Sequence, residues 1–175
     1  MQLNHPGKQS PKMLNKAPVS PSAGPFRKEL QAMFATPRAL EVSESEEIIQ
    51  RFASSAAIAE KAGFSGVQIH GAHGYLVHSF LPPLSNQRTD EYGGSLEGRM
   101  RLALEIARTV RAVWPEELPL FFRTSAVDGS EDGWQLEDTV VLAARLKEIG
   151  VDVMDCSSSG IAGSATGAAS GKRRP

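Results

Sequence analysis

Two histidines stand close together in the segment HGAHGY, and a tyrosine follows them. His70 and His73 each precede a glycine, a residue that permits tight turns and a close approach of backbone to a ligand. Two neighbouring imidazoles can both donate a hydrogen bond to one carbonyl oxygen, and the phenol of Tyr75 can supply a proton. The segment therefore predicts a site that binds an oxygen-bearing ligand.

A pair of imidazoles can also bind zinc, which requires a third protein ligand. Asp128, Asp155 and Cys156 have suitable side chains, but none of them stands at a tight ligand spacing. A metal-dependent hydrolase on a TIM-like scaffold is therefore the less favoured alternative.

The elements that must position these side chains alternate along the chain. Short apolar runs predict strands over 2–4, 64–70, 118–123 and 151–156. Helical spacing of apolar residues predicts helices between them, over 43–62, 95–115 and 135–149. The first helix is expected to begin with a capping box from Ser43 to Glu46. Six prolines predict that most of the first 40 residues form loops, and residues 71–94 read as a long connection.

Strands that alternate with helices indicate βαβ units and a parallel sheet, in which ligands bind at the carboxyl ends of the strands. The predicted strands bring Gln2, His70, Arg123 and Asp155 to that edge. Strand parity places Gln68 on the same face as His70. A fixed cation beside amides and imidazoles suits a planar, electron-accepting ligand or an oxyanion. The other two histidines, His5 and His78, are expected to have structural roles.

Composition excludes some classes of partner. The net charge of −1 provides no broad basic surface for nucleic acid, and no apolar run approaches the ~20 residues of a membrane span. The single cysteine, Cys156, excludes an intramolecular disulfide and fits a reducing compartment. The N-terminus has no signal-peptide pattern, so we expect a cytoplasmic protein.

The long segment HGAHGYLVHSFLPPLSNQRTDEYGGSLEGR resembles the signature of the Old Yellow Enzyme family of NAD(P)H:flavin oxidoreductases. MQLNHPGKQS resembles the third-strand segment of that family, LPLFFRTSA the fifth and VDVMDCSSSG the sixth. The histidine pair is similar to that of the dienoyl-CoA-reductase-like and thermophilic-like branches.

This resemblance implies an eight-stranded TIM barrel that carries FMN, with NADH or NADPH as the reductant. The reduced flavin would pass a hydride to the β-carbon of an activated alkene, usually an α,β-unsaturated carbonyl. By the same resemblance, Gln2 and Arg123 would contact the pyrimidine edge of the flavin. His70 and His73 would bind the carbonyl oxygen of the substrate, and Tyr75 would donate the proton to its α-carbon.

The resemblance covers only strands three to six of such a barrel. We therefore expect a partial TIM-barrel domain over 1–159, followed by a small-residue tail over 160–175 that is expected to be disordered. A truncated, non-catalytic fragment without stable flavin binding is the alternative function. Exposed sheet edges would favour self-association. The turn-rich part of the long connection, from residue 80 to 94, is expected to be a structural plug near the active site.

Overall fold

A four-stranded parallel sheet forms the centre of the computed structural model, which describes residues 1–24 and 32–161. The order of the strands across the sheet is β1, β4, β5 and β6. Their bounds are Gln2–Leu3 for β1, Val67–Gly71 for β4, Leu120–Ser125 for β5 and Val153–Ser157 for β6. The four strands lie near the predicted positions, and neighbours in the sheet follow one another along the chain, as in consecutive βαβ units.

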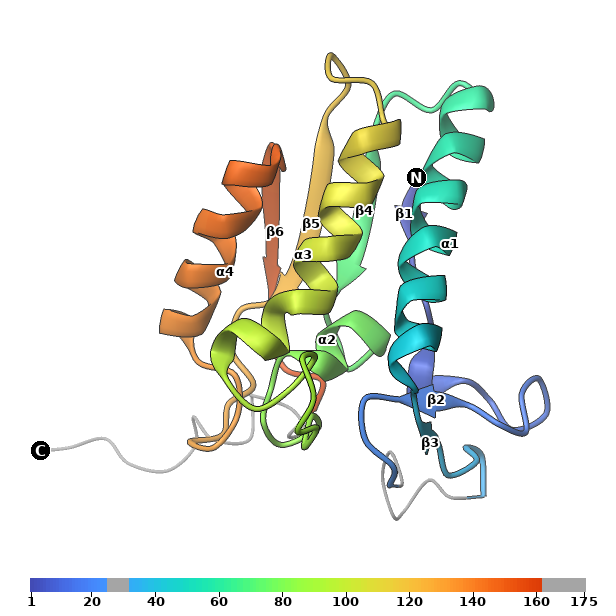
Figure 1. The fold of residues 1–175 in the computed structure, drawn as a ribbon, viewed down its shortest axis with the longest axis vertical. Helices are drawn as coiled ribbons and strands as arrows, with labels where there is room; N and C mark the ends of the chain where they lie inside the picture. The colour runs from blue at the N-terminus through green and yellow to red at the C-terminus, as the bar shows by residue number, and fades with distance from the viewer. Residues whose placement is uncertain (25–31, 162–175) are drawn as a thin grey trace, which may run out of the picture.

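Three helices cover one face of this sheet (Figure 1). They are α1 (Val42–Lys61), α3 (Leu96–Val113) and α4 (Leu136–Ile149). Alternate residues of β4 and β5 point into the core and are completely buried, namely Val67, Ile69, Leu120 and Phe122. The intervening residues face the opposite side, which none of the helices described here covers (Figure 1). We call this side the open face.

The first helix is capped two residues earlier than predicted, since Ser43 was the expected N-cap. Its N-cap is Glu41, and the Glu44 side chain accepts a hydrogen bond from the Glu41 backbone N–H at 2.9 Å. Arg38 holds the Glu44 carboxylate with two hydrogen bonds, so Glu44 takes the place that Glu46 was expected to take. The predicted capping box from Ser43 to Glu46 is therefore wrong.

The other helix boundaries follow local signals. The Ser95 hydroxyl accepts a hydrogen bond from the backbone N–H of Gly98 at 3.1 Å and so caps α3. Helix α4 starts after Gln135 and ends at Gly150, whose φ of 99° lies in the left-handed region. Both ends were predicted from these residues.

The long connection is more regular than the sequence indicated. It contains α2 (Leu76–Phe80), whose five residues are all buried at the carboxyl end of the sheet (Figure 1). Further on, the Asn86 amide donates hydrogen bonds to the carbonyls of Phe80 and Tyr92, both at 2.7 Å. Arg88 donates to the carbonyl of Leu40 at 2.5 Å. These bonds fix the connection against the body of the chain, which agrees with a structural role.

Besides β1, the described residues among the first 40 form three short elements where loop was expected. These are the 3-10 helix η1 (Gly7–Gln9) and the paired strands β2 (Val19–Ser20) and β3 (Arg38–Ala39). Of the predicted tail, 160–175, residues 162–175 lie outside the part of the chain that the structure describes. Within the described residues, no helix is both long and apolar enough to cross a membrane.

Candidate active site at the strand ends

The sheet register brings a histidine, an arginine and an aspartate into one row. His70 of β4 pairs with Arg123 of β5, and Arg123 pairs with Asp155 of β6. The turn after β4 adds His73 and Tyr75, whose rings lie 5.4 and 5.0 Å from the ring of His70, between centroids. We call these five residues the strand-end site. The predicted convergence of the imidazoles and the guanidinium is therefore found in the structure.

His70 is a buried, neutral hydrogen-bond donor. Only 4% of its surface is exposed, and its Nδ1 accepts the backbone N–H of Ala72 at 3.3 Å. An imidazole that accepts through Nδ1 carries its proton on Nε2, which is then able to donate. The pKa of His70 is lowered to about 4, mainly by burial and to a smaller extent by the neighbouring His73 and Arg123. His70 therefore stays uncharged at neutral pH.

The backbone of His73 is held in an unusual conformation. Its φ of 58° lies in the left-handed region, which costs free energy in a residue with a side chain. Its N–H donates to the Ser125 hydroxyl at 3.0 Å, and its carbonyl accepts from the Gln9 amide at 2.6 Å. The ring Nε2 lies 2.6 Å from the Ser157 hydroxyl. These three contacts come from distant parts of the chain and together hold the turn.

The charge environment of His73 resembles that of His70. Burial lowers the pKa of His73, and the positive charge of Arg123 acts in the same direction. Asp155 opposes both effects. Two uncharged imidazoles therefore lie side by side, each able to donate one hydrogen bond.

The short helix that follows Tyr75 fixes the position of this residue. Tyr75 is the N-cap of α2, and its N–H donates to the Ala72 carbonyl at 3.2 Å. The next residue, Leu76, donates to the carbonyl of His5 at 3.1 Å. The buried helix thus holds the phenol ring beside His70 at an interplanar angle of 65°.

A chain of polar contacts crosses the open face next to these rings. The Gln2 amide donates to Oε1 of Gln68 at 2.6 Å, and the Gln68 amide donates to Oδ2 of Asp155 at 3.0 Å. The same carboxylate oxygen lies 3.4 Å from Nε of Arg123. Nε of Arg123 is buried and has no hydrogen-bond partner among the described residues. A buried guanidinium N–H without a partner can donate a hydrogen bond to an anionic or carbonyl ligand, so this corner fits the polar edge of a flavin.

Some of these residues were predicted from the sequence, and others were not. His70, His73, Tyr75 and Arg123 lie at or beside the carboxyl ends of the strands, as predicted. Gln2 was expected there too, but it is the first residue of β1 and pairs with Gln68, two residues before His70. Gln68 and Asp155 were placed near the site, but their link to one another depends on the sheet register. The anchors of the His73 turn were not predicted at all. They are Gln9, Ser125 and Ser157.

The two remaining histidines do not belong to the strand-end site. Nδ1 of His5 accepts the backbone N–H of Gly7 at 3.1 Å. His78 is completely buried in α2, beneath the turn that carries His73. In the part of the chain that the structure describes, there is no cluster of three or more residues of the histidine, cysteine and acidic types suited to a metal ion.

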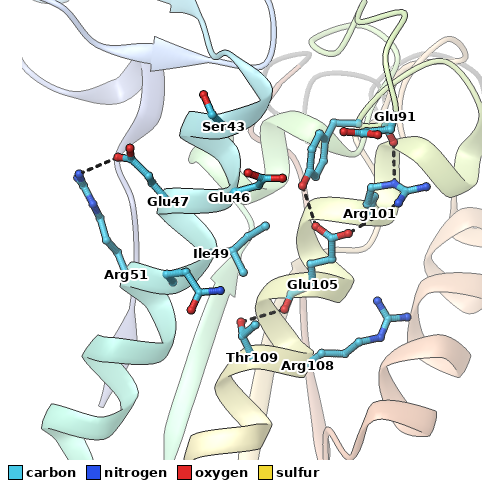
Figure 2. Close-up of a pocket in the computed structure, with 12 residues that line it drawn as sticks. Ser43, Glu46, Glu47, Ile49, Arg51, Glu91, Arg101, Glu105, Arg108 and Thr109 are labelled. Carbon is cyan, nitrogen blue, oxygen red and sulfur yellow. Dashed lines mark hydrogen bonds and ion pairs between the residues drawn. The ribbon is translucent and has the colours of Figure 1, made fainter.

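A further groove lies elsewhere, between α1 and α3 (Figure 2). Its volume is about 990 Å³. Its polar groups bind one another: the Tyr92 hydroxyl donates to Glu105 at 2.8 Å, and Arg101 donates to the Glu91 carbonyl at 2.8 Å. Burial and the bond to Glu105 raise the pKa of the Tyr92 phenol. The groove joins the long connection to α3 and lies on the helical side of the sheet, so we assign it a structural role.

Comparison with known proteins places these features in a family. The model of the NADH:flavin oxidoreductase / NADH oxidase family matches residues 1–173. The NADPH dehydrogenase of Bacillus cytotoxicus is 43% identical over 161 residues, which are 92% of this chain and 44% of that protein. The NADH oxidase of Thermoanaerobacter brockii is 41% identical over 160 residues, which are 90% of this chain and 24% of that protein. The chain thus spans less than half the length of these relatives.

Solved structures show the same similarity. Morphinone reductase in complex with tetrahydroNAD is 30% identical, with a TM-score of 0.79 over 89% of this chain and 47% of that one. The Old Yellow Enzyme homologue from Zymomonas mobilis is 29% identical, with a TM-score of 0.77 over 89% of this chain and 46% of that one. The predicted fold class, part of a (β/α)8 barrel, is confirmed by these matches.

Proposed function

Because the chain belongs to the NADH:flavin oxidoreductase / NADH oxidase family, we propose that it carries the reactive centre of an FMN-dependent NAD(P)H oxidoreductase that reduces activated alkenes. The observation that carries this proposal is the meeting of His70, His73, Tyr75 and Arg123 at one edge of the sheet. We further propose that the substrate is an α,β-unsaturated carbonyl compound, because two uncharged imidazoles suit a carbonyl oxygen.

Arg123 and Gln2 are the residues that we assign to the flavin. The Arg123 guanidinium has a buried N–H without a hydrogen-bond partner in the described part of the chain, and its positive charge would stabilise an anion. Gln2 supplies an amide from the neighbouring strand β1. It pairs with Gln68, which lies two residues before His70 in β4. When bound, FMN would accept reducing equivalents from NADH or NADPH and supply hydride to the alkene.

His70 and His73 are assigned to the carbonyl oxygen of the substrate. Hydrogen bonds from both imidazoles would draw electron density toward that oxygen and polarise the conjugated alkene. The lowered pKa values keep both rings uncharged at neutral pH. Because Nε2 of His73 contacts the Ser157 hydroxyl at 2.6 Å, a substrate oxygen that binds this nitrogen must compete with Ser157.

Tyr75 is assigned as the proton donor to the α-carbon. Its ring lies 5.0 Å from the ring of His70, so a molecule bound to that imidazole lies near the phenol. Proton transfer from a positioned side chain typically contributes ~10²–10⁴-fold to a rate.

A second candidate function follows from the share of the relatives that the chain covers. It spans 44% of the Bacillus cytotoxicus protein, and a chain that binds no flavin would be a non-catalytic form of this family. Self-association through the sheet edges at β1 and β6 and a cytoplasmic location also remain predictions. Sedimentation of the purified chain at several concentrations tests the first, and fractionation of the host cell tests the second.

Flavin binding separates the two candidate functions. The purified chain is mixed with FMN, passed through a desalting column and examined for flavin absorbance in the visible range. We expect retained flavin that NADH or NADPH bleaches under anaerobic conditions. A chain that emerges colourless would favour the non-catalytic candidate. Arg123→Gln serves as the control, because it keeps a long polar side chain and removes the charge.

A further inference from the structure

A histidine and an aspartate form a buried pair beneath the strand-end site. His78 lies in α2, and Asp128 lies in the connection between β5 and α4. Both side chains are completely buried, and Nε2 of His78 lies 3.4 Å from Oδ1 of Asp128. Neither atom has a hydrogen-bond partner among the residues described, because their mutual contact has an ion-pair distance but lacks the alignment of a hydrogen bond. Leaving two such groups unpaired would cost about 1–3 kcal/mol each, so this pair requires an explanation.

The other nitrogen of His78 binds the backbone of the turn that carries His73. Nδ1 accepts the N–H of Gly74 at 2.8 Å. An imidazole that accepts through Nδ1 carries its proton on Nε2, which is the atom that faces Asp128. The carboxylate therefore selects the tautomer of His78 that is able to accept from Gly74.

Asp128 is itself firmly held. Its Oδ2 accepts the backbone N–H of Trp134 at 3.1 Å, and its own N–H donates to the Trp134 carbonyl at 3.0 Å. Burial lowers the pKa of Lys8 to about 8, and Asp128 acts on Lys8 in the opposite direction. A cation therefore lies within electrostatic range of the buried carboxylate.

Gly74 stands between His73 and Tyr75, and its φ of 75° continues the left-handed turn that begins at His73. We propose that Asp128 and His78 act as a positioning pair: Asp128 fixes the His78 tautomer, and His78 holds the Gly74 N–H so that His73 and Tyr75 keep their orientation. The inference rests on the proposed function only in the roles given to His73 and Tyr75. His78 is fully buried and is argued to act through Gly74, so it is a positioning residue and not a catalytic one.

The chain offers two matched substitutions that separate the two contacts of His78, with Gly74 and with Asp128. The amide oxygen of His78→Asn is able to accept the Gly74 N–H in place of Nδ1, but this side chain is too short to reach Asp128. The longer amide of His78→Gln reaches Asp128 in place of Nε2 and has no acceptor in the position of Nδ1. Only His78→Asn therefore preserves the bond to Gly74.

The readout is the ring ¹⁵N spectrum of the histidines in the full chain, which requires no flavin. We expect the unaltered chain to show His78 with its proton on Nε2. His78→Gln should shift the ring signals of His73 and lower alkene reduction about 100-fold, since a misplacement of about 1 Å costs on that order. His78→Asn should keep the His73 signals near those of the unaltered chain. Flavin reduction by NADPH should stay unchanged in both variants, because neither alters Gln2 or Arg123.

Asp128→Asn provides an independent measurement. An amide has one acceptor oxygen where the carboxylate has two, so it is unable to serve both Trp134 and His78. If its oxygen stays with Trp134, its NH₂ group faces Nε2 of His78 and drives the proton to Nδ1. We expect the His78 signals to move toward that second tautomer. Should His78→Gln fail to fold, this measurement decides the matter.

Leu142→Ala in the core of α4 is the control for general destabilisation, since Leu142 is completely buried and lies on a helix away from the turn. The proposal is overturned if His73 signals stay unchanged in His78→Gln, or if Leu142→Ala shifts them equally. It is also overturned if His78 keeps one tautomer in Asp128→Asn. A chain that binds no flavin but shows the expected shifts refutes the proposed function and leaves the positioning pair intact.

Discussion

His70 and Arg123 occupy directly paired positions on the neighbouring strands β4 and β5. The pairing places an uncharged imidazole next to a permanent cation on the open face of the sheet. Arg123 is one of the charges that lower the pKa of His70, so the arginine helps to keep the imidazole uncharged. The two side chains therefore suit different ligand groups: the guanidinium can bind an anion, and the imidazole can donate a hydrogen bond to a carbonyl oxygen.

Removal of the positive charge at Arg123 should weaken flavin binding. A hydrogen bond to a charged group contributes about 1.5–3 kcal/mol, so Arg123→Gln should raise the dissociation constant for FMN roughly 10- to 150-fold. Titration of the chain with FMN, followed by flavin fluorescence, measures this change. Thr109→Val is a suitable control, because Thr109 lies on α3 and bonds only to helix carbonyls. Equal affinities for FMN in the Arg123→Gln variant and the unaltered chain would remove Arg123 from the flavin site.

The stability of the chain should fall as the solution becomes acidic. Burial lowers the pKa of His70 to about 4, whereas the ordinary value is 6.5, so the unfolded chain binds a proton first. The contribution of His70 to the free energy of unfolding is complete above pH 6.5 and is lost progressively as the pH falls toward 4. It amounts to at most about 3 kcal/mol.

Urea denaturation at pH 7, 5.5 and 4.5 tests this dependence in the chain and in His70→Gln. The variant has no titrating group at position 70, so its free energy of unfolding should fall less steeply. His73 contributes to both slopes in the same direction, because its pKa is lowered as well. If the free energy of unfolding fell equally steeply with pH in both proteins, His70 would take up its proton equally in the folded and unfolded states.

Most of the fold was predictable because its signals are local. Alternating apolar residues marked β4 and β5, and Ser95 and Gly150 marked helix ends through their own backbone contacts. The start of α1 was misplaced because Arg38, a residue outside the helix, holds Glu44. Helix α2 was missed because five wholly buried residues show no amphipathic period; it exists because the surrounding core encloses it.

The part of the site that lies at the strand ends was predictable. His70 and Arg123 end adjacent apolar runs, and parallel strands bring such ends together. The contacts of His73 with Ser125 and Ser157 were not predictable in this way. They join residues 52 and 84 positions apart, and they depend on the exact register of three strands and the path of the turn.

Loss of the Tyr75 hydroxyl should slow one half of the reaction only. Tyr75→Phe keeps the ring beside His70 and removes the proton donor, so alkene reduction should fall by ~10²–10⁴-fold. Reduction of the flavin by NADPH needs no proton from Tyr75 and should keep its rate. Stopped-flow absorbance measures the two half-reactions separately. If both rates fell together, Tyr75 would be acting on flavin or cofactor binding instead.

Substitution of Gly74 should destabilise the chain far more than substitution of a glycine with a similar backbone. Gly74 and Gly63 have φ values of 75° and 80°, so alanine at either position pays about 1–2 kcal/mol for the left-handed conformation. A Cβ at Gly63 meets nothing within 4 Å, whereas a Cβ at Gly74 would lie 2.4 Å from the carbonyl oxygen of Gly160. Gly74→Ala must therefore also displace backbone, at a further ~1–3 kcal/mol. Urea denaturation of both variants measures the difference, and equal losses would mean that the Gly160 segment yields freely and does not clamp the turn that carries His73.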